Sequence, residues 1–257
     1  MGPDGSLFAA GWKTPAGGGF SQSNIYRFDP ASGADLGFWA DYFSLDQIDA
    51  GPDGILYGLG STSRNYLQRW DLSTGAALSA LNLPTSTNAQ HFAFDCQHKL
   101  IVASTTKIQQ FSSIDGSLME TIAELDVPNY YYTDLTIGPD GDVYATIAEN
   151  SRSGVTPDDS VVRYDRSAGE VISRLYVDQV APRPTSLAFG PDGGLYVGSR
   201  NDQTLVRLGS ESNSIAWKTV LPGFRNADHI VFAAVVPEPT GVAIAAIGGA
   251  LVSMRRR

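Results

Sequence analysis

Short stretches of alternating apolar and polar residues recur along the chain, and each follows the same kind of tight turn. The turn reads Gly-Pro-Asp-Gly at Gly2–Gly5, Gly51–Gly54, Gly138–Gly141 and Gly190–Gly193, with a degenerate copy at Asp95–His98. Successive copies start 49, 44, 43 and 52 residues apart. Proline presets the first turn position and the last glycine supplies a positive φ, so each copy predicts a hairpin. A period of this length is typical of propeller blades.

Two further elements repeat after each turn. The apolar stretch that follows at once predicts a second strand, as in Leu56-Tyr57-Gly58 and Leu195-Tyr196-Val197. A third strand comes later, and a glycine turn follows it in four of the five repeats, at Gly33, Gly75, Gly116 and Gly169. With the strand that precedes the turn, each repeat makes one four-stranded blade. The sequence therefore predicts an all-β fold, a β-propeller over residues 1–233 with five visible blades.

The inner strand of each blade precedes its turn. Four such strands are expected at Gln47–Ala50, His91–Phe94, Asp134–Ile137 and Ser186–Phe189. A fifth, His229–Phe232, has no turn after it, whereas the first turn has no inner strand before it. In one interpretation the two halves join and close a five-bladed ring. In the other, Met1 lies inside an inner strand, and the natural chain begins upstream with a signal peptide and further blades.

Within the repeats, the third strands read Val-Arg-Tyr-Asp at Val162–Asp165 and Val-Arg-Leu-Gly at Val206–Gly209. Together with the Leu-Tyr-Val strands, these residues make the body similar to the NHL and gluconolactonase-like group of propellers, and Leu195–Arg207 is the closest stretch. The repeated arginines Arg27, Arg69, Arg163 and Arg207 are expected to pair with acids such as Asp29, Asp71 and Asp165. The repeated Asp4, Asp53, Asp140 and Asp192 are expected to form turns and not to bind metal.

One polar register along the inner strands is a candidate site. Four residues before each of the last four turns, and at the matching position of the fifth inner strand, the chain carries a polar side chain, at Gln47, His91, Asp134, Ser186 and His229. If the inner strands line the axis, these side chains form a ring at one mouth of the channel. Two histidines and an aspartate are suitable ligands for a divalent metal, and the resemblance implies metal and acid/base residues at this mouth. The alternative is a solvated ring that binds nothing.

Other candidate chemistry is sparse. The lone Cys96 excludes an intrachain disulfide, and as a turn thiol it has no evident catalytic base. The aromatic residues Phe38, Trp39 and Tyr130–Tyr132 are candidates for stacking on sugars, although aromatic side chains in blades more often fill the space between sheets. The formal net charge is −9, which argues against nucleic acid as a partner.

The C-terminal segment carries the most specific signal in the chain. It reads Pro237-Glu238-Pro239-Thr240, then an uncharged apolar run from Gly241 to Met254, then Arg255, Arg256 and Arg257. As a helix the fourteen apolar residues would reach about 21 Å, short of the roughly 30 Å of a membrane core. The arginines would stay on the cytoplasmic side.

This three-part order resembles the PEP-CTERM sorting tail of Gram-negative envelope proteins. The resemblance implies an exosortase-type processing enzyme as a partner and transient retention in the inner membrane. Residues 234–257 are therefore expected to be a linker and a sorting tail with a short hydrophobic helix. Residues 1–20, in contrast, lack the basic start and apolar core of a secretory signal.

Together these features predict an exported, non-enzymatic protein of the envelope or extracellular matrix that binds a partner, such as a surface protein, or a polysaccharide. No cofactor is expected in this interpretation. The alternative is a metal-dependent lactonase or lyase acting at the channel mouth.

Overall fold

The computed structural model describes residues 7–13, 22–29, 32, 34–41, 45–60, 64–95, 97–149, 159–190, 192–199, 204–209, 215–220, 229–231 and 251–253. All regular elements in these ranges are strands. No helix among the described residues is long and apolar enough to cross a membrane.

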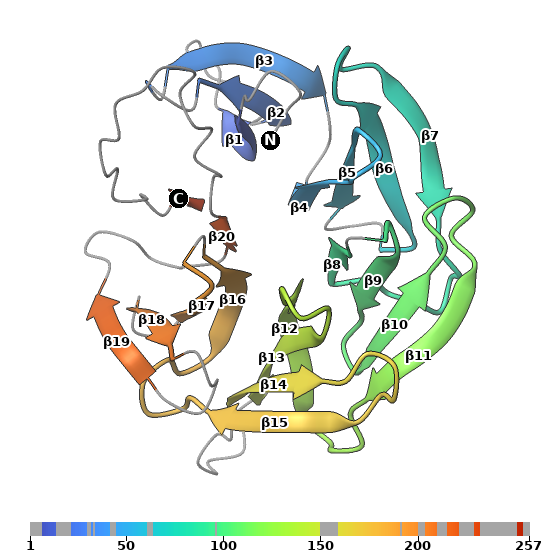
Figure 1. Cartoon of the computed structure of the whole chain (residues 1–257). Helices are drawn as coiled ribbons and strands as arrows, with labels where there is room; N and C mark the ends of the chain where they lie inside the picture. Colours follow the sequence, from blue (N-terminus) through green and yellow to red (C-terminus); the bar gives the residue numbers. More distant parts are fainter. Residues whose placement is uncertain are drawn as a thin grey trace.

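The strands form five blades, each an antiparallel meander, arranged as a ring (Figure 1). The first blade has the three strands β1 (Leu7–Lys13), β2 (Gln22–Phe28) and β3 (Asp35–Asp41). The second has β4 (Leu45–Ala50), β5 (Ile55–Gly60), β6 (Tyr66–Asp71) and β7 (Ala77–Asn82). The third has β8 (His91–Phe94), β9 (Leu100–Ala103), β10 (Lys107–Phe111) and β11 (Leu118–Glu124).

The fourth blade has β12 (Tyr130–Ile137), β13 (Val143–Glu149), β14 (Ser160–Tyr164) and β15 (Val171–Tyr176). The fifth has β16 (Pro184–Phe189), β17 (Leu195–Ser199), β18 (Thr204–Leu208) and β19 (Ile215–Val220). The inner strands β4, β8, β12 and β16 surround the centre, and β3, β7, β11, β15 and β19 form the rim (Figure 1). The predicted five-bladed propeller and its strand order are confirmed.

The core lies between neighbouring blades, because each sheet buries both of its faces. Tyr57 and Leu67 of the second blade pack with Phe92 of the third, and Ile108 of the third packs with Leu135 of the fourth. The fourth and fifth blades share a cluster of the same kind. The second strands are therefore buried along most of their length, which explains their Leu, Tyr, Val and Ile content.

The Gly-Pro-Asp-Gly turns that contain Asp53, Asp140 and Asp192 are fastened by the strands beside them. The Tyr144 hydroxyl donates a hydrogen bond to Oδ2 of Asp140 at 2.8 Å, and Tyr57 does the same to Asp53. In addition, Arg163 contacts Oδ2 of Asp142 at 2.6 Å and Oδ2 of Asp140 at 3.0 Å. The turn aspartates thus form turns, as predicted, and they also hold the second and third strands.

Arg163 and Arg207 pair with acidic side chains of their blades, as expected, but Asp165 is not the partner of Arg163. Arg163 pairs with acids of the Gly-Pro-Asp-Gly turn, as Arg207 does through Nε to Asp192 at 2.8 Å. Asp165 instead accepts hydrogen bonds from the backbone N–H groups of Ser167 and Ala168. The reason is that Asp165 lies just beyond the end of β14, where its carboxylate forms the glycine turn.

The chain end does not close the ring in the expected way. β20 (His229–Val231) pairs with β21 (Leu251–Ser253), and the first blade's sheet has the order β1-β2-β3 within the described residues. The expected C-terminal helix is wrong for Leu251–Ser253, which are extended because they supply the backbone partners of β20. The first Gly-Pro-Asp-Gly copy lies outside the described residues, as do Phe232 and the rest of the apolar run.

Candidate functional site

The polar register of the inner strands is shaped by a bulge. In β4, β12 and β16 the pairing with the second strand shifts immediately before Gln47, Asp134 and Ser186. A bulge inserts one unpaired residue and re-aims the side chains that follow it. All three of these side chains are buried, at 7%, 2% and 0% exposure.

Gln47 joins the second blade to the third. Its Nε2 donates to the carbonyl oxygen of Phe92 at 2.7 Å, and its Oε1 accepts from the Phe92 N–H at 3.0 Å. The side-chain amide thus pairs with both backbone groups of one residue on β8. Such pairing satisfies polar groups that would be costly to bury alone.

Asp134 makes the equivalent connection between the fourth and fifth blades. Its Oδ2 accepts a hydrogen bond from the backbone N–H of Leu187 on β16 at 2.8 Å, and its Oδ1 accepts from the N–H of Leu135 at 2.8 Å. Burial raises the pKa of Asp134 to about 7, although both backbone donors act to lower it. The nearby Asp49 carboxylate raises this pKa further.

His91 lies beside the same carboxylate. Its Nδ1 is 3.4 Å from Oδ1 of Asp134, so the third blade also approaches Asp134. His91 and Asp134, on consecutive inner strands, thus lie side by side, and Ser186 is buried on the next inner strand, β16. His229 begins β20, and its side chain lies outside the described residues.

Asp49 is a second acidic group of the inner strands, two residues after Gln47. The equivalent residues are Ala93, Thr136 and Ala188. The side chain is half-buried, and its Oδ1 accepts a hydrogen bond from the Ala50 N–H at 2.8 Å. Burial raises the pKa of Asp49 to about 6. The repeat pattern predicted no role for this residue.

The described residues offer little for metal coordination. They contain no group of three or more His, Cys, Asp or Glu side chains placed to hold a metal ion. The Gln47 amide and the Asp134 carboxylate both bind backbone groups of the next blade. Their arrangement is suited to holding blades together.

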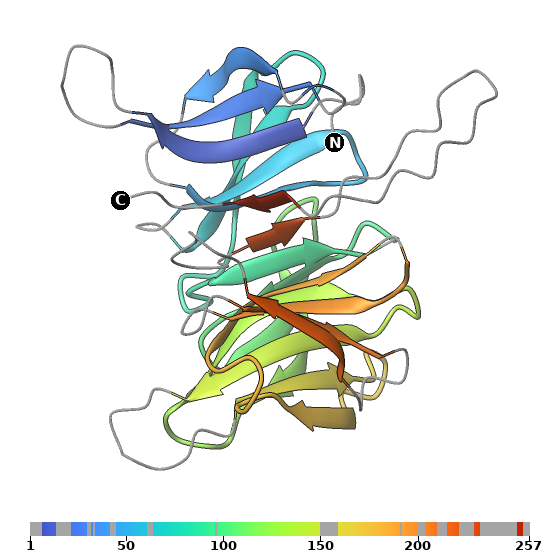
Figure 2. The same cartoon turned by 90° about the vertical axis from the view of Figure 1, so that its left-hand side faces the viewer.

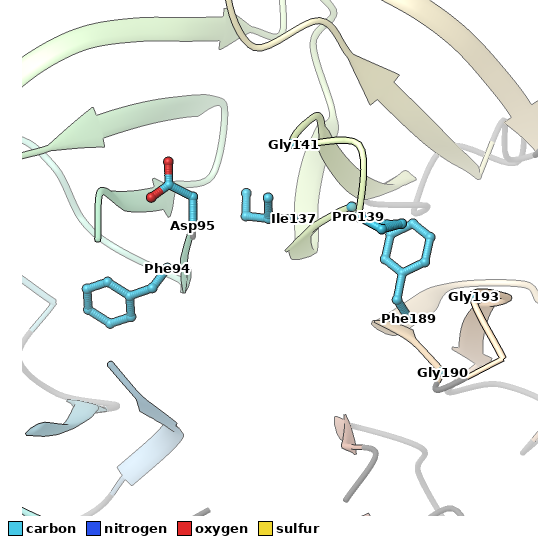
Figure 3. Close-up of a pocket in the computed structure, with 9 residues that line it drawn as sticks. Phe94, Asp95, Ile137, Pro139, Gly141, Phe189, Gly190 and Gly193 are labelled. Carbon is cyan, nitrogen blue, oxygen red and sulfur yellow. The ribbon is translucent and has the colours of Figure 1, made fainter. Parts of the chain in front are cut away.

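A pocket lies at the other end of the inner strands, beside the turns of the third, fourth and fifth blades. Its volume is about 540 Å³. Apolar side chains from the three blades lie round one opening (Figure 3). Phe94, Asp95, Ile137, Gly138, Pro139, Gly141, Phe189, Gly190 and Gly193 line it. We call it the turn-side pocket.

Its one charged lining residue belongs to the degenerate turn. Asp95 is 4% exposed, and its Oδ1 accepts from the N–H groups of Gln97 and Lys99. Its Oδ2 pairs with Arg166, which also donates to Oε1 of Gln110 at 2.7 Å. His98 adopts a φ of +66°, the left-handed conformation that Gly54, Gly141 and Gly193 have at the same turn position. Asp95 thus replaces the missing turn aspartate and holds the fourth blade through Arg166.

The aromatic candidates divide between core and surface. Tyr132 is buried, with its hydroxyl 2.9 Å from that of Tyr164. Tyr131 receives a hydrogen bond from Arg183 at 3.3 Å, and Trp39 packs on Phe8 with ring centroids 4.6 Å apart. Phe38 is 56% exposed. Cys96 and the sorting residues Pro237, Glu238, Pro239, Arg255, Arg256 and Arg257 lie outside the described residues.

Comparison with known proteins supports the propeller fold and assigns no activity to this chain. No protein-family model matches the chain, and no curated protein matches it. Among solved structures, hydrazine synthase of Kuenenia stuttgartiensis has a TM-score of 0.61 at 12% identity, covering 86% of this chain and 76% of that chain. Virginiamycin B lyase of Staphylococcus aureus has a TM-score of 0.56 at 16% identity, covering 88% and 78%.

The calcium-binding protein regucalcin of Agrobacterium tumefaciens has a TM-score of 0.56 at 20% identity, covering 74% of this chain and 64% of that chain. At these sequence identities the similarity to the three proteins concerns the fold alone.

Proposed function

We propose that this chain is a non-enzymatic propeller of the cell envelope or extracellular matrix, exported and sorted through its C-terminal tail, that binds a partner protein or a glycan on one face of the ring. The observation that carries the proposal is the occupation of the inner polar register. Gln47 and Asp134 use their polar atoms to bind the backbone of the next blade. A catalytic or metal site would need those atoms to face a ligand.

The proposed location rests on the tail sequence. Pro237-Glu238-Pro239, the apolar run and the three terminal arginines match the order of a PEP-CTERM signal. The acidic propeller is consistent with an envelope or matrix location. Anionic membrane surfaces would repel it, so only the tail would retain the protein at the membrane. An exosortase-type enzyme of a Gram-negative bacterium is the proposed processing partner, and membrane retention is transient.

The turn-side pocket is the proposed contact surface. Phe94, Ile137 and Phe189 present apolar surface from three blades, and apolar pockets with few polar groups are the usual ligand sites of proteins. Proline and glycine backbone between these side chains lets a flat ligand or a loop approach closely.

Two measurements test the proposal. The chain, expressed in an exosortase-bearing host, is expected to lose its tail and to reach the envelope or medium, and Pro237→Ala with Pro239→Ala is expected to retain the tail. The purified protein is then screened against glycans and envelope extracts, with Ile137→Arg as the pocket variant and Asp126→Arg as the surface control. An unprocessed tail would overturn the proposed sorting, and binding equal in both variants would overturn the proposed surface.

A metal-dependent lactonase or lyase remains the second candidate, because one observation favours it. The His91 imidazole lies 3.4 Å from an aspartate whose pKa is raised to about 7, a pairing suited to proton transfer near neutral pH. A bound divalent ion and turnover of lactone substrates, both lost in His91→Ala, would support this candidate over the first.

A further inference from the structure

The edge of β20 is occupied by a strand from the chain's C-terminal segment. β20 pairs antiparallel with β21, with His229 opposite Ser253, Ile230 opposite Val252 and Val231 opposite Leu251. Figure 2 shows the two strands side by side between the first and fifth blades. In every four-stranded blade the inner strand instead pairs with the second strand of its own blade.

β20 lies where the inner strand of the next blade belongs. The fifth blade's inner strand β16 contacts β12 and β13 of the blade before it, and β20 contacts β16 and β17 in the same way. On the other side, β1 contacts the inner strand β4 of the second blade, as β13 contacts β16. β20 thus lies at the position of an inner strand and β1 at the position of a second strand, and both positions belong to the same blade.

The repeat also gives the register that would join them. In the second blade, Ile48 lies opposite Gly58, which is four residues after the last glycine of its turn. The equivalent residues are Ile230 and Ala9, since Ala9 is four residues after Gly5. Val252 therefore occupies, opposite Ile230, the place that the repeat assigns to Ala9.

We propose that β20 and β1 are two halves of one blade and that β21 is a placeholder that keeps them apart. When β20 pairs with β21, only the edge of β20 is covered. When β20 pairs with β1, the edges of both strands are covered and the ring is closed. Displacement of β21 therefore converts an open ring into a closed one. This inference does not depend on the proposed sorting, since any event that removes β21 from β20 has the same effect.

Engineered cysteine pairs report the two states in the full-length chain with Cys96→Ser. The pair Ile230→Cys with Val252→Cys reports the open ring, and Ile230→Cys with Ala9→Cys reports the closed one. Directly opposed residues on antiparallel strands have Cβ atoms about 4.5–5.5 Å apart, so a small backbone adjustment brings them to the roughly 3.5–4.5 Å of a disulfide under mild oxidation. We expect the first pair to cross-link in the otherwise unchanged chain and the second to cross-link at least about tenfold less, a ratio that corresponds to about 1.4 kcal/mol.

Proline substitutions in β21 then shift the balance. Successive N–H groups of a strand point to opposite edges, so one of Val252→Pro and Ser253→Pro removes a donor from the β20 ladder. That variant is expected to raise the Ile230–Ala9 cross-link about tenfold, with Val252→Thr and Ser253→Thr as controls that keep the N–H. The proposal is overturned if the Ile230–Ala9 pair cross-links as readily before the proline change, or if neither proline changes it. The purified chain reports this result whether or not the tail is a sorting signal.

Discussion

The Asp134 carboxylate on the inner strand of the fourth blade accepts a hydrogen bond from the Leu187 N–H on the inner strand of the fifth, with Oδ2 and N 2.8 Å apart. Gln47 makes the equivalent connection to Phe92 between the second and third blades. In each case a bulge precedes the polar residue. Two members of the inner polar register, Gln47 and Asp134, thus connect neighbouring blades.

Removing the Asp134 side chain should destabilise the fold. Asp134→Ala leaves the Leu187 N–H without its side-chain acceptor between two packed blades, and an unsatisfied buried donor costs about 1–3 kcal/mol. Urea unfolding at neutral pH measures the loss. Asp126→Ala, an exposed aspartate, is the control and should change stability by no more than about 0.5 kcal/mol. Equal effects of the two substitutions would contradict the inter-blade role.

Gln47→Glu should introduce a pH-dependent defect. The glutamate can still accept from the Phe92 N–H, but an ionised oxygen would replace Nε2, which lies 2.7 Å from the Phe92 carbonyl oxygen. Only the protonated acid can donate there, so the folded-state pKa of the new carboxyl is raised. The variant should be less stable than wild type by about 1–3 kcal/mol near pH 7 and should recover as the pH falls toward 5. A defect that is constant with pH would argue against this geometry.

The wild-type protein should itself lose stability as the pH rises from about 5 to about 7. The pKa values of Asp134 and Asp49 are raised from 3.8 to about 7 and about 6, so over this range these two groups bind more protons in the folded chain than in the unfolded chain. Carboxyl groups whose pKa is lowered by folding, such as those of Asp71 and Asp165, are largely ionised in both states above about pH 5. The free energy of unfolding then falls by at most about 1.4 kcal/mol per pH unit for each group. Protonated His91 beside Asp134 favours the ionised carboxylate and reduces that group's share.

Asp49→Asn isolates one part of this dependence. The variant lacks the titrating carboxyl, so its stability relative to wild type should increase as the pH rises from 4 toward 6. Urea unfolding at a series of pH values gives this difference directly. A difference that does not change with pH would show that the pKa of Asp49 is not raised.

Two glycines with similar backbone conformations should differ sharply in their tolerance of alanine. Gly116 has a φ of +74° and Gly141 a φ of +86°, so both substitutions incur the left-handed backbone cost of about 1–2 kcal/mol. A Cβ on Gly116 would also lie 1.9 Å from the carbonyl oxygen of Asn82 on the neighbouring blade, whereas one on Gly141 meets nothing within 4 Å. Gly116→Ala should therefore cost about 1–3 kcal/mol more than Gly141→Ala in thermal unfolding. Similar costs would mean that the blades are not in contact at Gly116.

The repeat made the fold predictable from the sequence. The Gly-Pro-Asp-Gly turns mark the hairpins, and the predicted inner strand His91–Phe94 matches β8 at both ends. The partners of the repeated arginines were not predictable in the same way. Arg163 and Asp165 are close in sequence, but Arg163 reaches Asp142, which lies 21 residues earlier, just after the Gly138–Gly141 turn.

The position of the polar register is predictable from the turns, but its bonds to the next blade are not. A bulge has no fixed sequence signature, so nothing near Thr133 indicated that Asp134 would turn toward the next blade. The replacement of the missing turn aspartate by Asp95 could not be predicted either, because Arg166, the partner of Asp95, lies 71 residues away. Distant pairing of this kind depends on the ring arrangement of blades.

The most direct test of the structural role of the inner register is thermal unfolding of the full chain in EDTA and in about 1 mM Ca²⁺, Mn²⁺ or Zn²⁺. A metal bound a hundredfold above its Kd would add about 2.7 kcal/mol to stability and raise the Tm by roughly 5 °C or more. We predict the same Tm in all four conditions, within about 1 °C. A rise of several degrees with one metal that is abolished by His91→Ala would contradict the account.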